Sequence, residues 1–225
     1  MPIMPFTPRA EPLKWGSPNA KRHIILLHGL TGSGRAFLPI AQYLNEMLAT
    51  PSHFILPSAP LRSVDWADNQ RVSGWYNLPK GSFLQQQDQN GLLSAMSYVH
   101  SLLDELNTQG IEMDKVIIGG FSQGGALSLL SGLLYPHKLG GIFALSGYLP
   151  IASWIAQHQR NENRQTPIFL AHGELDNVIS LTEFKQGMLS LSQENRPLVA
   201  KQYPIGHYIV EPEVADLAEW INSLR

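Results

Sequence analysis

The sequence contains no cysteine among its 225 residues. Disulfide bonds, metal sites built from thiolates and a cysteine nucleophile are therefore excluded. Long hydrophobic runs are also missing, since no stretch reaches the roughly 18 apolar residues typical of a membrane-spanning helix. The first 16 residues hold four prolines and lack the apolar core of a signal peptide. From these absences we expect a cytoplasmic protein without a membrane span.

Charge is also scarce, because only 15% of the residues are charged and the net charge is −2. No run of lysine or arginine indicates a nucleic-acid partner or an anionic membrane surface. The hydrophobic fraction of 44% is typical of a folded globular chain. Its length suits one domain, residues 1–225, in which the proline-rich residues 1–22 form an irregular or short-stranded lead-in.

The most informative stretch is residues 116–125, where an apolar run rich in β-branched residues leads directly into an apolar helix. Residues 120–124, GFSQG, fit the pattern G-x-S-x-G, which holds a serine at a sharp strand-to-helix turn. Glycine is needed on both sides because larger side chains would collide in so tight a turn. The helix N-terminus would stabilise an oxyanion beside the serine. The context therefore predicts that Ser122 is a nucleophile.

Strand-like and helix-like segments alternate along the rest of the chain. Buried strands are expected at residues 23–28, 53–56, 115–121, 141–145, 167–171 and 198–203. Amphipathic helices are expected from 36–38 to 48, at 88–108, after Ser122 up to Pro136, at 181–191 and at 214–224. This alternation predicts an α/β fold with a mostly parallel central sheet and helices on both faces.

Two segments lack a clear periodicity. Residues 61–86 show neither helical nor strand periodicity and are expected to form a long loop. Residues 151–165 are polar, with at most one helical turn, and are expected to be a surface excursion. The loops that carry suspected functional residues all follow strands, so we expect them to meet at the carboxyl edge of the sheet.

A catalytic serine needs a base, and the base needs an orienting acid. For a serine in this kind of turn, the expected chain order is serine, acid, histidine. Seven of the eight histidines precede Asp176, and only His207 lies after the last strand. We therefore predict that His207 is the base and Asp176 its acid, in preference to Glu174. The competing interpretations are a helix cap at Asp176 and an ordinary surface turn at His207.

An oxyanion hole needs two N–H donors. Gln123, the residue after the nucleophile, supplies one, and Leu30 in the loop after the first buried strand is predicted to supply the other. The glycines of residues 29–34 do not match a phosphate-binding pattern, and the lysine of a P-loop is missing.

A metal site is a weaker alternative, because no ligand spacing such as H-x-x-x-H supports it. Its ligands would come from His28, His172, Asp176 and His207. We expect neither a metal nor a cofactor.

Several blocks occur in an order that resembles the acyl-protein thioesterase family, also called the phospholipase/carboxylesterase family of α/β-hydrolases. The blocks are residues 27–30, 56–60, 74–77, 120–128, 145–150, 172–176 and 206–207. The resemblance spans about residues 23–225. It implies an α/β-hydrolase fold with no large cap domain and hydrolysis of carboxylic esters or thioesters. It also implies the same site residues: Ser122 as nucleophile, Asp176 as acid, His207 as base, and Leu30 and Gln123 as oxyanion donors.

The substrate is less well indicated than the reaction. Residues 74–77, GWYN, stand where eukaryotic members more often have a small residue followed by Trp, Phe and Asp, and 151–165 has no clear match. We expect an apolar acyl groove over Ser122, formed by Trp66, Trp75, Tyr76, Tyr148 and Leu149. The expected substrates are small or lipid-like acyl esters and thioesters, acylated proteins included.

Two other functions remain as alternatives. One is a catalytically inactive α/β-hydrolase scaffold that only binds a ligand or partner. The other is a peptidase or lactone hydrolase on the same fold. The intact Ser-Asp-His order argues against the first, and the missing cysteine disfavours the thiol-dependent dienelactone hydrolases. The sequence specifies neither acyl length nor oligomeric state.

Overall fold

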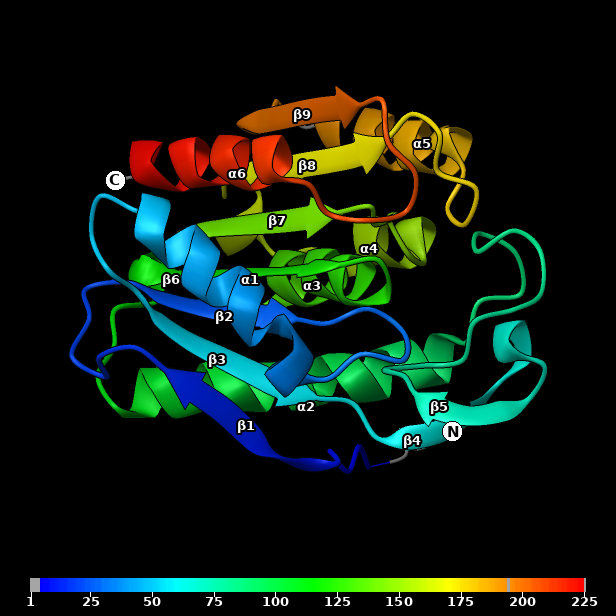
Figure 1. The fold of residues 1–225 in the computed structure, drawn as a ribbon, viewed down its shortest axis with the longest axis horizontal. Helices are drawn as coiled ribbons and strands as arrows, with labels where there is room; N and C mark the ends of the chain where they lie inside the picture. Colours follow the sequence, from blue (N-terminus) through cyan, green and yellow to red (C-terminus); the bar gives the residue numbers. More distant parts are fainter. Residues whose placement is uncertain (1–4, 194, 225) are drawn as a thin grey trace.

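The computed structural model describes residues 5–193 and 195–224. Its centre is a seven-stranded sheet in the order β1-β3-β2-β6-β7-β8-β9 (Figure 1). The strands are β1 (Ala10–Trp15), β2 (His23–Leu27), β3 (His53–Ser58), β6 (Val116–Phe121), β7 (Gly141–Leu145), β8 (Ile168–Gly173) and β9 (Leu198–Tyr203). Every neighbouring pair is parallel except β1 with β3. The mostly parallel sheet is therefore confirmed, and the lead-in contributes one antiparallel edge strand.

Helices cover both faces of this sheet (Figure 1). On one face lie α1 (Gly34–Met47) and α6 (Glu211–Ser223). On the other face lie α2 (Gln89–Thr108), α3 (Gln123–Leu134), α4 (Ala152–His158) and α5 (Leu181–Ser192). Alternate strand residues pack into these two layers: Ile24 belongs to the α1/α6 core and Ile25 to the core beneath α2 and α3. A strand buried on both faces needs apolar residues throughout, which is why the strands appear as unbroken apolar runs.

The carboxyl edge of the sheet has no separate domain above it within the residues that the structure describes. The described helices include none that is long and apolar enough to cross a lipid bilayer.

Helix α1 begins at Gly34, so the expected start at 36–38 was wrong by at least two residues. The reason is a side-chain cap: Ser33 Oγ accepts a hydrogen bond from the Ala36 N–H at 3.1 Å. Pro39 therefore lies beyond the first turn, where its missing N–H leaves the Arg35 carbonyl without its usual helical donor.

Residues 61–86 contain regular structure that the sequence did not indicate. Strands β4 (Leu61–Val64) and β5 (Gln70–Ser73) form an antiparallel hairpin. A single 3₁₀ turn, η1 (Asp65–Ala67), lies at its tip. Each strand has only four residues and is mostly exposed, so no apolar alternation marks it. The hairpin lies beyond the carboxyl ends of the parallel strands, where it can contribute to a site (Figure 1).

Residues 151–165 are not simply a surface excursion. They form α4 and a short 3₁₀ turn, η3 (Asn161–Asn163), and Asn163 is fully buried. The Asn163 Oδ1 accepts from the Leu139 N–H at 2.9 Å, and its Nδ2 donates to the Tyr135 carbonyl at 2.8 Å. This buried amide joins the segment to the connection between α3 and β7, which a polar sequence does not reveal.

Glu213, in the first turn of α6, is a buried carboxyl group. It is 1% exposed, and neither of its carboxyl oxygens has a hydrogen-bond partner in the described part of the chain. Burial raises the pKa of Glu213 from 4.5 to about 7, although the nearby Val210 N–H acts in the opposite direction. The folded protein therefore holds this proton more tightly than the unfolded chain.

Glu213→Gln should therefore raise stability at high pH and not at low pH. Between the ordinary value of 4.5 and about 7, the folded state binds more protons, so the wild type loses stability as the pH rises. We expect the melting temperatures of variant and wild type to agree at about pH 4 and the variant to melt several degrees higher at about pH 8. An equal difference at both pH values would contradict the raised pKa.

Candidate active site

Ser122 lies in the single-residue turn between β6 and α3. Its backbone has φ 55° and ψ −119°, a conformation that residues other than glycine rarely adopt. The Ser122 N–H donates to the Leu145 carbonyl at 2.8 Å, and its own carbonyl accepts from the Ala126 N–H at 3.0 Å. A Cβ at Gly120 or Gly124 would collide with backbone oxygen of β2, as the sequence pattern predicted. The local geometry is that of a nucleophile elbow.

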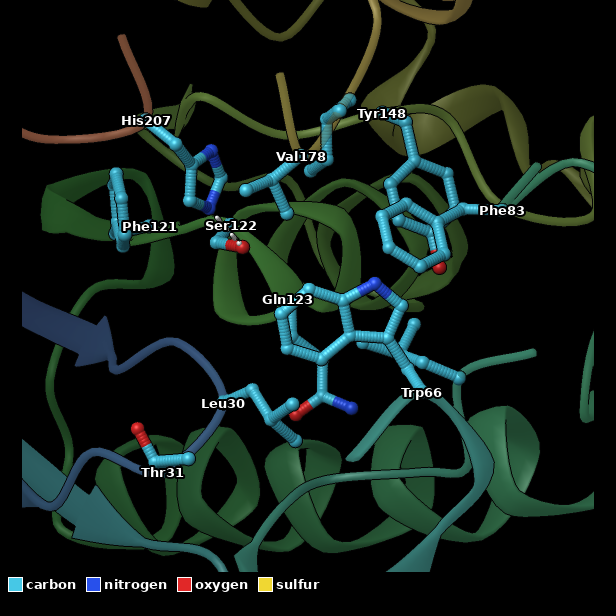
Figure 2. A pocket seen from close by; sticks show the side chains of 12 residues that line it. Leu30, Thr31, Trp66, Phe83, Phe121, Ser122, Gln123, Tyr148, Val178 and His207 are labelled. Carbon is cyan, nitrogen blue, oxygen red and sulfur yellow. Dashed lines mark hydrogen bonds between the residues drawn. The ribbon is translucent and has the colours of Figure 1, made fainter. Parts of the chain in front are cut away.

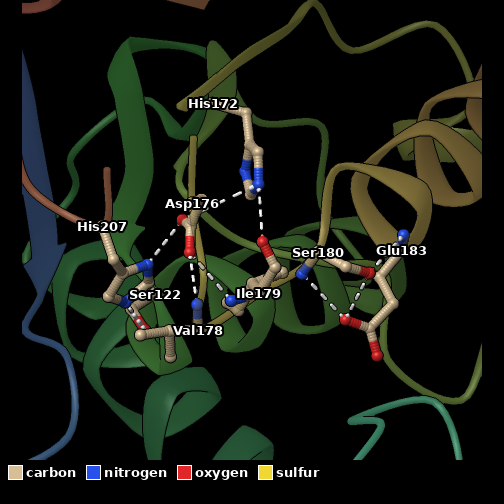
Figure 3. Close-up of polar contacts among 8 residues, drawn as sticks. All are labelled: Ser122, His172, Asp176, Val178, Ile179, Ser180, Glu183 and His207. Carbon is tan, nitrogen blue, oxygen red and sulfur yellow. Dashed lines mark hydrogen bonds and ion pairs between the residues drawn. The ribbon is translucent and has the colours of Figure 1, made fainter. Parts of the chain in front are cut away.

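The three predicted side chains meet at the carboxyl edge of the sheet (Figure 3). Ser122 Oγ lies 2.8 Å from His207 Nε2, and His207 Nδ1 lies 2.6 Å from Asp176 Oδ2. A carboxylate only accepts hydrogen bonds, so Nδ1 carries the proton in this arrangement and Nε2 is left to accept from the serine hydroxyl. This order of groups can remove a proton from Ser122.

Asp176 is held as a carboxylate by its own turn. Its Oδ1 accepts from the Val178 N–H at 2.8 Å and from the Ile179 N–H at 2.9 Å. Burial alone would raise the pKa of Asp176, but the hydrogen bonds from His207 and these two N–H groups outweigh it and lower the pKa. The cap of α5 is Ser180 and not Asp176. The competing candidate Glu174 has an exposed side chain.

His172 is a neighbour of Asp176 to which the sequence analysis assigned no place in a serine site. It is fully buried, its Nε2 donates to the Ile179 carbonyl at 3.0 Å, and it lies 3.7 Å from Asp176 Oδ2. Burial lowers the pKa of His172, although the Ile179 carbonyl acts against it. The neutral ring stacks on Phe184 at 4.6 Å and supports the turn that carries Asp176.

The loop after β2 is fixed by a buried histidine. His28 Nδ1 donates to the Gly29 carbonyl at 2.6 Å, and its Nε2 accepts from the Ala59 N–H at 3.0 Å. Burial lowers the pKa of His28 to about 4, so the ring is neutral and can play both roles. Among the described residues, the N–H groups of Leu30 and Gln123 have no acceptor. Both remain free to bind an oxygen atom beside Ser122.

The side chain of Gln123 joins the elbow to the segment after β5. Its Oε1 accepts from the Trp75 N–H at 2.9 Å, and its Nε2 donates to the Tyr76 carbonyl at 2.7 Å. Trp75 Nε1 donates to the His28 carbonyl at 2.8 Å. Both aromatic residues are fully buried. Trp75 and Tyr76 therefore support the elbow and the loop after β2 and do not line the cavity, which corrects the expectation from the sequence.

An apolar cavity of about 180 Å³ opens beside Ser122 and His207 (Figure 2). Trp66 and Tyr148 line it as expected, whereas Leu149 is buried away from it. The Tyr148 ring stacks on Phe83 with centroids 5.8 Å apart. Several wall residues were not predicted from the sequence, because single apolar residues in loops carry no periodic signal. These are Leu30, Leu78, Phe83, Val178 and Ile179.

The residues of the alternative metal site have other partners. Within the described chain, no three His, Asp or Glu side chains are arranged so that they could bind a metal. His28 is held by Gly29 and Ala59, and His207 lies between Asp176 and Ser122.

Comparison with known proteins assigns the chain to a family. The description "Phospholipase/Carboxylesterase" belongs to the family profile that matches residues 14–225. Acyl-protein thioesterase 1 of Yarrowia lipolytica is 36% identical over 213 residues, covering 89% of this chain and 90% of the relative. Carboxylesterase SOBER1 of Arabidopsis thaliana is 33% identical over 206 residues, covering 90% of each chain. The crystal structure of Arabidopsis thaliana SOBER1 superposes with a TM-score of 0.83 at 31% identity, over 89% of this chain and 97% of that one. The chain therefore belongs to the phospholipase/carboxylesterase family of carboxylic ester hydrolases, with the α/β-hydrolase fold.

Proposed function

We propose that this protein hydrolyses carboxylic esters or thioesters of apolar acyl groups through an acyl-enzyme on Ser122. The observation that carries the proposal is the hydrogen-bonded series Ser122–His207–Asp176 at the mouth of an apolar cavity. The names of the relatives, thioesterase and carboxylesterase, support the choice of both bond types. A cytoplasmic location stays a prediction from the sequence.

In the first half of the reaction, His207 Nε2 accepts the hydroxyl proton as Ser122 Oγ bonds to the carbonyl carbon. The electron pair of the carbonyl moves to its oxygen, which the N–H groups of Leu30 and Gln123 stabilise together with the N-terminus of α3. When this intermediate collapses, the bond to the leaving oxygen or sulfur breaks. The leaving group takes the proton from His207, and the acyl group stays on Ser122.

In the second half, water takes the place of the leaving group. His207 accepts a proton from the water, and the hydroxide oxygen bonds to the acyl carbon. Collapse of the second intermediate breaks the bond to Ser122 Oγ, which recovers its proton from His207. Asp176 keeps the imidazole in the required tautomer and stabilises its transient positive charge without taking up the proton.

The experiment that tests the proposal combines labelling with turnover. A fluorophosphonate probe should label the wild type, and p-nitrophenyl esters of increasing acyl length should be hydrolysed beside an S-acylated peptide. The ratio of kcat/KM for the ester to kcat/KM for the thioester then reports which of the two bonds the enzyme prefers. A protein that is neither labelled nor active on any of these substrates would support the inactive scaffold.

The cavity predicts different effects on acyl-chain selectivity for two tryptophans. Trp66 lies at the mouth and is 43% exposed, so Trp66→Ala should reduce kcat/KM for octanoate more than for acetate. Each acyl methylene that loses its apolar contact costs up to roughly 0.8 kcal/mol, or about fourfold in rate. Trp75 supports the elbow, so Trp75→Ala should reduce both esters equally. The measurement is kcat/KM for both esters, and loss of selectivity in Trp75→Ala alone would contradict this assignment.

A further inference from the structure

Glu183 is a buried carboxyl group that lies behind the wall of the cavity. It is 8% exposed. Its Oε1 accepts from Ser82 Oγ at 2.7 Å and from the Phe83 N–H at 2.8 Å. Its Oε2 accepts from the Ser180 N–H and from Ser180 Oγ, both at 3.0 Å (Figure 3). Each oxygen therefore has two donors, and the two pairs come from different parts of the chain.

Helix capping accounts for only half of this arrangement. Ser180 and Glu183 form a capping box at the start of α5, in which the side chain of each residue bonds to the backbone of the other. A capping box needs only the contacts of Oε2. The contacts of Oε1 reach the Ser82–Phe83 segment, which lies 100 residues away in the sequence. Glu183 therefore joins two distant segments as well as capping its helix.

The two joined segments both contribute to the cavity wall. Phe83 lines the cavity, and so do Val178 and Ile179, directly before Ser180. Residues 74–88 contain no helix or strand, so no regular hydrogen-bond ladder positions Phe83. Its position instead depends on the Glu183 carboxylate and on stacking against Tyr148. A buried carboxylate that loses its hydrogen-bond donors costs free energy. The Glu183 carboxylate therefore strongly favours the one arrangement of the two wall segments in which all four donors reach it.

We propose that Glu183 is a positioning residue that fixes the relative position of these two segments of the cavity wall and thereby the acyl-chain selectivity of the enzyme. The proposal rests on the function proposed above, because it concerns how the same cavity holds the acyl group. Glu183 contacts neither Ser122 nor His207 in the structure and takes no part in the chemistry.

Glu183→Gln is the informative variant because it changes hydrogen bonding with little change in volume. An amide has one acceptor oxygen and one NH₂ donor, so it can satisfy only one of the two pairs of donors. The other pair of donors then faces the NH₂ group of the glutamine in place of an acceptor. The side chain therefore no longer joins the two wall segments by hydrogen bonds. We expect the ratio of kcat/KM for octanoate to that for acetate to fall by about tenfold, the contribution of one to two buried methylenes.

The same variant should leave the chemistry intact. We expect kcat/KM for acetate to change by less than about twofold, and the pH profile for acetate to be unchanged. An equal fall for acetate and octanoate would show that Glu183 acts on the fold or on the catalytic residues and would overturn the proposal. An unchanged ratio would overturn it as well.

A double-mutant cycle makes the test independent of the general stability of Glu183→Gln. If Glu183 acts through Phe83, then Glu183→Gln should have no further effect on the ester ratio once Phe83→Ala has removed that wall. Additive effects of the two substitutions would contradict the proposal. If Glu183→Gln does not fold, Ser82→Ala removes one donor to Oε1 and should lower the ratio by a smaller factor, about threefold, and an unchanged ratio would count against the proposal.

Ser180→Ala is the matched control. It removes the capping hydroxyl but keeps the Ser180 N–H as a donor to Oε2 and both contacts of Oε1. It should lower the melting temperature and leave the ester ratio unchanged, because the Val178 and Ile179 N–H groups still bond to Asp176 Oδ1 and hold that part of the wall. Failure of the proposed function is recognised separately, since the wild type would then hydrolyse neither ester and would not react with the fluorophosphonate.

Discussion

Replacing Ser122 by alanine should lower kcat for ester hydrolysis by about 10⁴-fold or more, leaving only binding and oxyanion stabilisation. Within the described residues, the hydroxyl has one protein partner, His207 Nε2, so its removal takes away the nucleophile without breaking a structural hydrogen bond. The backbone strain at φ 55° is the same for alanine as for serine, and the variant should therefore fold.

The measurement pairs steady-state hydrolysis of p-nitrophenyl esters with fluorophosphonate labelling followed by mass spectrometry. The label should attach to Ser122 in the wild type and to nothing in Ser122→Ala. Labelling of the variant at the wild-type rate would mean that another residue is the nucleophile. A melting temperature close to that of the wild type shows that lost activity is not lost folding.

The second large effect is expected from Asp176→Asn, at roughly 10⁴-fold in kcat. Oδ1 of Asp176 accepts from two backbone N–H groups, those of Val178 and Ile179. An asparagine must place its oxygen there, which turns its NH₂ group towards His207 Nδ1. Nδ1 can then only accept, so the proton moves to Nε2. The imidazole no longer accepts the proton of Ser122.

Glu174→Gln is the control for this prediction. Its side chain is exposed, and we expect kcat within about twofold of the wild type. A loss as large as that of Asp176→Asn would show that the wrong acid was chosen.

Because the pKa of Asp176 is lowered, the carboxylate stays ionised well into the acid range. The acid limb of the kcat/KM profile should therefore have the slope of a single proton, and a slope of two would contradict this.

The elbow and the meeting of Ser122, Asp176 and His207 at one edge could be predicted from the sequence because the signals are local. A buried strand, two glycines and an apolar helix within ten residues specify where Ser122 must lie. In a parallel sheet, residues that follow strands reach the same edge whatever the strand order. Asp176 and His207 could therefore be placed near Ser122 before any pairing of strands was known.

The cavity wall could not be predicted in the same way. Trp75 and Phe83 are both isolated aromatic residues in a segment without periodicity, yet only Phe83 lines the cavity. The difference arises from contacts with distant parts of the chain, Gln123 and His28 for Trp75 and Glu183 for Phe83. No local pattern records such partners. The short exposed strands of the β4–β5 hairpin were missed for a related reason, since their pairing buries little apolar surface.

The strand order determines when activity appears as the chain folds. β6, β7, β8 and β9 lie side by side in chain order, and β9 forms the edge of the sheet. His207 follows β9, so its imidazole reaches Ser122 only after this edge strand has docked. Local opening of this edge strand withdraws His207 from Ser122 while the elbow stays in place. It also breaks the hydrogen bonds from the Glu174 N–H to the Tyr203 carbonyl and from the Leu175 N–H to the Ile205 carbonyl, just before Asp176. For the function proposed above, the return of ester hydrolysis during refolding therefore cannot precede the docking of β9.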